Sequence, residues 1–175
     1  TAATTCSATG AYPISFTASG AKAANYAVTV NGANLTVMAR PITVPKSATS
    51  RAYGDANPTL NASVGGSGLA TGCGGTLADV GTVATAATQC SAVGSYPIGF
   101  TANGVKAGNY SVTVSAANLT VQARSITVTA TAATRVYGDA NPTLNATAGG
   151  SGLAAACGDT LADVGALSTA ATQCS

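Results

Sequence analysis

One phrase occurs twice in this chain and limits what it can fold into more than any other feature does. Residues 53–62, Tyr-Gly-Asp-Ala-Asn-Pro-Thr-Leu-Asn-Ala, return unchanged at residues 137–146, a step of 84 residues. The same step relates residues along the whole chain: Cys6, Cys90 and Cys174; Cys73 and Cys157; Tyr12 and Tyr96; Tyr26 and Tyr110; Arg40 and Arg124. A period of this length predicts a tandem array of domain-sized units.

The phase of the repeat divides the 175 residues into three parts. We predict one complete repeat at residues 41–124, preceded by the back half of a repeat at residues 1–40. The front half of the next repeat follows at residues 125–175. Residues 1–40 and 85–124 are identical at 29 of 40 positions, so the two back halves are expected to fold alike once each is completed.

The composition favours a folded extracellular protein. Only 7% of the residues are charged, whereas an ordinary soluble surface is roughly 25–35% charged. Val, Ile and Thr fall into alternating runs and the net charge is only +2, which argues against disorder. We interpret the low charge as a surface partly covered by neighbouring chains, as in a fibre.

Several function classes are disfavoured by the same residues. Seven scattered basic residues offer no patch for nucleic acid, and no run approaches the roughly 18 apolar residues of a membrane span. Glu and His are absent. Asp55 and Asp139 fall in expected turns, while Asp79 and Asp163 occupy two copies of one segment. We predict no catalytic residue, no metal site, no cofactor and therefore no enzyme.

The cysteines predict disulfides in an oxidising compartment, because their shortest spacing of 17 residues does not suit a zinc site. The repeat leaves two pairings open. Partners 17 apart give Cys73–Cys90 and Cys157–Cys174, with Cys6 unpaired or bonded between subunits. Partners 67 apart give Cys6–Cys73 and Cys90–Cys157, with Cys174 left over. We favour the first, because its loop stays within one repeat and its closure stabilises the fold by about 3 kcal/mol.

Alternating apolar residues predict strands at 11–17, 26–30 and 35–37. Asn31-Gly32 predicts a hairpin turn between the last two. Residues 119–128 cross a repeat boundary almost as one strand, which predicts a stiff connection and hence a rod. Residues 69–80 predict one short helix with Thr76 as its N-cap.

The repeated phrase itself predicts a turn. Gly54 can take a positive φ, Asp55 and Asn57 can bond to their own backbone, and Pro58 fixes its own φ. Tyr53 is expected to anchor the turn on the apolar core. The second copy supplies the same set: Tyr137, Gly138, Asp139, Asn141 and Pro142.

These pieces, in this order, resemble the MBG-type repeat marked by a Tyr-Gly pair, found in large bacterial secreted adhesins and haemagglutinin-like surface proteins. The matching segments are 126–129, 136–144, 151–153, 158–161, 93–98, 107–110 and 118–121. The resemblance implies an all-β, mainly antiparallel fold of about 84 residues, β-grasp-like or an immunoglobulin-like sandwich, used in series as a stalk. It carries over no catalytic residues, and the cysteines are not a general feature of that pattern.

Two functions remain open from the sequence. The first is a structural repeat of an extracellular bacterial fibre or adhesin stalk at the cell surface, with itself as partner. Front and back halves of different copies would then complete one another head to tail, and such a contact gives a filament. The alternative is an adhesive module that itself binds glycan or host protein.

Overall fold

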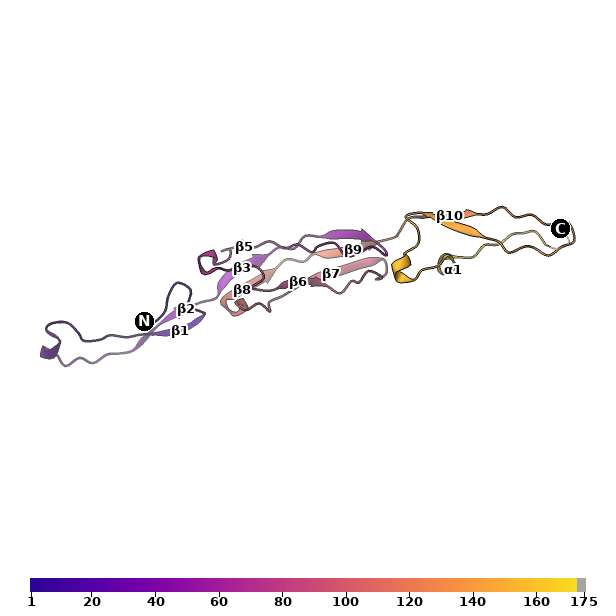
Figure 1. Ribbon diagram of the computed structural model, residues 1–175. Coiled ribbons are helices and arrows are strands. Elements are labelled where there is room, and N and C mark those ends of the chain that lie inside the picture. The colour runs from indigo at the N-terminus through magenta and orange to yellow at the C-terminus, as the bar shows by residue number, and fades with distance from the viewer. Residues whose placement is uncertain (173–175) are drawn as a thin grey trace. The chain divides into compact units, whose positions relative to one another are not determined.

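The computed structural model describes residues 1–172, and the fold is nearly all-β (Figure 1). The strands are β1 (Gly10–Ile14), β2 (Ala33–Val37), β3 (Arg40–Val44), β4 (Thr49–Ala52), β5 (Gly65–Gly66), β6 (Thr82–Thr85), β7 (Gly94–Thr101), β8 (Tyr110–Val114), β9 (Asn118–Gln122), β10 (Ile126–Ala130) and β11 (Ala146–Gly150). The helices are short: η1 (Ala23–Asn25), η2 (Thr71–Cys73), η3 (Ala107–Asn109), η4 (Ala155–Cys157) and α1 (Leu161–Val164).

The chain divides into two compact units, each assembled from three separate segments. Unit 1 comprises residues 1–47, 60–84 and 99–117, and unit 2 comprises residues 48–59, 85–98 and 118–175. Each unit therefore holds residues from both sides of a predicted repeat boundary. The boundaries at 40/41 and 124/125 themselves stay predictions.

Unit 1 contains an antiparallel pair and a small mixed sheet. β1 pairs with β2, joining Gly10 to Val37 at one end and Ile14 to Ala33 at the other. β3 is the middle strand of the order β5-β3-β8, antiparallel to β5 and parallel to β8. The core beneath this sheet consists of four buried residues: Ile42, Val44, Val80 and Tyr110.

Unit 2 is organised around β9. This strand lies between β4, which is parallel to it, and β7, which is antiparallel. β7 continues into unit 1, where β6 completes the four-stranded order β4-β9-β7-β6. β10 and β11 form a separate antiparallel pair in unit 2. The buried residues of unit 2 are Ala87, Ile98, Leu119, Val121, Ala154 and one charged side chain, Arg51.

The all-β, mainly antiparallel prediction is confirmed, since four of the pairs above are antiparallel and two are parallel. The β-grasp or sandwich assignment and the rod stay predictions. The hairpin predicted at residues 26–37 is wrong: β8 and β9, its counterparts in the complete repeat, lie in different sheets. A period-two pattern fixes which face of a strand is apolar, but it does not choose the neighbouring strand.

Two further expectations met different outcomes. Residues 119–128 do not run as one strand, because β9 ends at Gln122 and β10 begins at Ile126. The predicted cap forms in both copies. Thr160 is the N-cap of α1 and exchanges capping-box hydrogen bonds with Asp163, while Thr76 and Asp79 exchange the same bonds across a single turn.

Candidate functional site

The disulfides lie at the two joints between successive repeats. Cys6 is bonded to Cys73 within unit 1, and Cys90 to Cys157 within unit 2, each pair with its Cα atoms 5.5 Å apart. In each pair the first cysteine belongs to the back half of one repeat and the second to the front half of the next. Each disulfide therefore ties two successive repeats together.

The favoured pairing of Cys73 with Cys90 is accordingly wrong, and Cys6 is not unpaired. Cys174, the expected partner of Cys157, lies outside the described residues. Cys73 and Cys90 belong to different compact units, whereas each observed pair lies within one. Loop length could not have decided the question: closing a 67-residue loop is worth about 4 kcal/mol, against about 3 kcal/mol for 17 residues.

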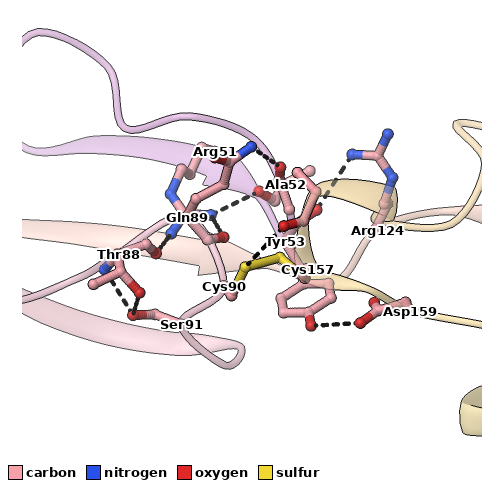
Figure 2. Close-up of a disulfide and its surroundings, with 12 residues drawn as sticks. Arg51, Ala52, Tyr53, Thr88, Gln89, Cys90, Ser91, Arg124, Cys157 and Asp159 are labelled. Atoms are coloured by element: carbon pink, nitrogen blue, oxygen red, sulfur yellow. Dashed lines mark hydrogen bonds between the residues drawn. A yellow bond between two sulfur atoms is a disulfide. The ribbon is translucent and has the colours of Figure 1, made fainter.

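Arg124 holds the second joint with its whole guanidinium group (Figure 2). On the side of the following repeat, its Nε donates to the carbonyl of Gly152 (2.8 Å) and Nη2 to that of Ser151 (2.6 Å). On its own side, Nη1 donates to the Tyr53 carbonyl (3.2 Å) and to Asp55 Oδ1 (2.7 Å). The planar fork of arginine suits such a cluster of acceptors, which lysine could not serve in the same way.

The first joint repeats half of this clamp. Arg40, the counterpart of Arg124, donates from Nε to the carbonyl of Gly68 (2.7 Å) and from Nη2 to that of Ser67. Thr9 adds two bonds in unit 1, from its amide to Asn109 Oδ1 (3.0 Å) and from its hydroxyl to the Gly108 carbonyl (3.2 Å). The sequence gave one usable signal for the clamp: an arginine recurs at the same repeat position in a chain with only seven basic residues.

The predicted turn motif lies at the second joint. Asp55 donates its amide to the Ala52 carbonyl (3.2 Å) with Gly54 at φ +82°, the geometry of a type II turn. A Cβ on Gly54 would lie 2.3 Å from the Cβ of Ala154, so glycine also permits the close approach of the next repeat. Tyr137, Gly138 and Asp139 form the same turn in the second copy, with Gly138 at φ +91°.

The polar side chains of the motif bond to other segments and not to their own turn. Asn57 accepts from Arg51 Nε at 2.8 Å and donates to the Ala87 carbonyl at 2.6 Å. Asn141 repeats the second bond with the Ala171 carbonyl (2.7 Å). Arg51, which the sequence did not single out, is buried and also donates to the carbonyls of Ala52, Thr88 and Gln89. No polar contact of Pro58 or Pro142 enters this arrangement.

Tyr53 reaches across the second joint. Its hydroxyl donates to Asp159 Oδ1 at 3.2 Å (Figure 2). Partial burial, followed by this hydrogen bond and the nearby negative charge, raises the pKa of the Tyr53 phenol above its usual value. The residue is thus a polar bridge between repeats as well as the apolar anchor that the sequence suggested.

A cavity of about 310 Å³ lies beside the first disulfide, lined in part by Cys6, Met38, Arg40, Lys106 and Tyr110. Both of its cations are engaged: Arg40 as described, and Lys106 with the Cys73 and Gly74 carbonyls and with Asp79 at 3.5 Å. Across residues 1–172, no cluster of three or more His, Cys, Asp or Glu could hold a metal ion. No helix in that range is long and apolar enough to cross a membrane.

Comparison with known proteins gives one result. The family model of the MBG domain (YGX type) matches residues 42–120 and again residues 126–175. No curated protein and no solved structure matches the chain. The two matches lie one after the other, begin 84 residues apart and cover most of the sequence. The chain belongs to the MBG domain family of the YGX type.

Proposed function

We propose that this chain is a structural repeat of an extracellular bacterial fibre or adhesin stalk. MBG domains of this type are repeat modules of surface proteins. The observation that carries the proposal is the position of the disulfides, each of which covalently joins two successive repeats. A stalk needs firm connections between its modules, and a disulfide at every joint supplies them.

The arginine clamps support the same function. Arg40 and Arg124 follow a strand at the end of a repeat and bind two carbonyls of the next repeat. A hydrogen bond from a charged donor contributes roughly 1.5–3 kcal/mol. Such bonds restrain the joint beyond what the disulfide alone would do, in contrast to the free rotation of a Gly/Ser linker.

The proposed location follows from the same bonds. Disulfides persist in oxidising environments such as the cell surface and are rare in the reducing cytosol. A chain with a low charge and two joint disulfides fits a secreted, repetitive surface polypeptide. We propose a structural role without catalysis, and the adhesive alternative stays a prediction from the sequence.

Immunogold electron microscopy tests the proposal on intact cells that make the natural polypeptide. Antibodies raised against the 175-residue chain should label extended surface structures without permeabilisation. A membrane-impermeant maleimide should label the joint cysteines (Cys6, Cys73, Cys90 and Cys157) only after an impermeant reductant is added. Labelling that requires permeabilisation would contradict the proposal. Saturable binding of the chain to a glycan array would favour the adhesive module instead.

A further inference from the structure

Identical or similar residues are buried in the complete repeat and exposed in the two half repeats. In the back half at residues 1–40, Tyr26 is 70% exposed and Leu35 43%, while their counterparts Tyr110 and Leu119 are 9% and 0% exposed. The front half at residues 125–172 shows the same contrast. Val128 is 44% and Val164 56% exposed, while Val44 and Val80 are fully buried. The half repeats thus present the apolar faces that the complete repeat covers.

The half repeats also lack the strands that depend on the missing half. Residues 110–114 form β8 because β3 pairs with them, yet the similar residues 26–30 form no strand. Residues 49–52 form β4 beside β9, yet residues 133–136 form no strand. The backbone groups of these segments are therefore available for strand addition.

The complete repeat identifies what covers each face. The turn that follows Thr76 enters the back half, where the Gly104 amide donates to the Val80 carbonyl (3.0 Å) and the Lys106 amide to the Asp79 carbonyl (2.7 Å). Two glycines permit this approach. A Cβ on Gly81 would lie 2.2 Å from the Thr101 carbonyl oxygen, and one on Gly104 would lie 2.2 Å from Asp79 backbone atoms.

In the half repeats the corresponding places are open. A hollow of about 460 Å³ is lined by Phe16, Gly20, Lys22, Tyr26 and neighbouring residues. A second hollow of about 250 Å³ is lined by Val128, Leu161, Val164, Gly165, Ala166 and Leu167. A Cβ on Gly20 or Gly165, the counterparts of Gly104 and Gly81, would meet nothing within 4 Å.

We propose that the front half of one copy, residues 125–172, docks onto the back half of a second copy, residues 1–40, and completes a repeat between chains. The occupant is a second copy because this chain carries both complementary faces and, at residues 41–124, an assembled example of their contact. The inference deepens the proposed function and rests on it. It names the partner of the stalk repeat and the surfaces through which copies join head to tail.

The register of the docked strands follows from the complete repeat. Ile42 pairs with Val112 and Val44 with Val114, so β10 pairs with the other copy's residues 26–30 with Ile126 opposite Val28 and Val128 opposite Val30. Thr49 pairs with Leu119, so Ala133 lies opposite Leu35 of β2.

The polar contacts transfer in the same way. The ion pair of Lys106 with Asp79 (3.5 Å) is reproduced between Lys22 and Asp163. The contact of Arg124 with Asp55 (2.7 Å) is reproduced between Arg40 and Asp139.

Two single-methyl substitutions test the contact. In the unassembled chain Gly165→Ala and Gly20→Ala have open space, so each variant should keep the wild-type circular dichroism spectrum and melting temperature. Sedimentation velocity of the wild type should show concentration-dependent oligomers. Each variant should weaken association at least about tenfold, because overpacking displaces backbone at the contact. Gly32→Ala is the matched control: Gly32 is open too, the second copy has Ala116 there, and association should be unchanged.

Mixing the two variants tests the direction of assembly. Gly165→Ala damages only the front face and Gly20→Ala only the back face. An equimolar mixture should therefore form a discrete dimer whose two remaining faces are defective. A wild type that stays monomeric, variants that associate normally, or a mixture that gives no dimer would each overturn the docking proposal. None of these results would alter surface labelling, which tests the stalk function separately.

Discussion

The joint disulfides determine how far the chain can be stretched. Tension applied at the two ends passes through each disulfide and bypasses the residues between its cysteines. The two loops of 67 residues remove 134 of the 175 residues from the stretched path, which leaves 41. At about 3.5 Å per residue, the oxidised chain should extend to about 150 Å and the fully reduced chain to about 600 Å. Each broken disulfide should thus release about 230 Å.

Single-molecule force spectroscopy measures these lengths directly on chains held by terminal tags that contain no thiol. The double variant Cys90→Ser/Cys157→Ser should lengthen the maximum extension by one increment, and Cys6→Ser/Cys73→Ser by an equal one. The matching increments serve as mutual controls, since the two loops contain the same number of residues. Increments of about 55 Å would indicate loops of 17 residues and refute the joint assignment. An extension of about 600 Å without reductant would do the same.

Three further predictions concern the joint and the capped turn. Arg124→Ala should lower the free energy of unfolding by about 2 kcal/mol in urea titrations, because several carbonyls lose a charged donor; Arg124→Lys should recover only part, and an unchanged midpoint would count against the clamp. Gly54→Ala should cost about 2–3 kcal/mol through its positive φ and its overlap with the next repeat; the control Gly138→Ala, with open space around it, should cost less. The pKa of Asp79 is lowered, first by the backbone amide of Thr76 and then by its hydroxyl. Its stabilising contribution is therefore present above about pH 4 and lost as the pH falls through the lowered value. Asp79→Asn should flatten the acid limb of stability against pH, and an unaltered limb would contradict this.

Local residue chemistry was sufficient for some of the structure. Thr76 and Thr160 cap their turns as an N-cap threonine should, and both copies do so with an aspartate three residues later. Gly54 and Gly138 adopt the positive φ that the turn requires. These features depend on neighbours within a few residues, so they could be deduced without knowing the fold.

The candidate site could be predicted only in part. The two-fold recurrence of Arg40 and Arg124 marked the boundary between repeats, but not the carbonyls that each arginine binds. Arg51 gave no signal at all, because its burial depends on acceptors 37 and 38 residues away. The cysteine spacings allowed two pairings whose loop-closure energies differ by only about 1 kcal/mol, which is too little to choose between them.

The sequence by itself determined the 84-residue period, the all-β class, the family and the local turns, because each is written in composition, alternation or short-range motifs. Only the tertiary structure decided which cysteines pair and which alternating segments become strands. Residues 110–114 form a strand and the similar residues 26–30 do not. A strand needs hydrogen bonds from a partner, and a disulfide needs two segments to meet; both conditions are set by distant parts of the chain.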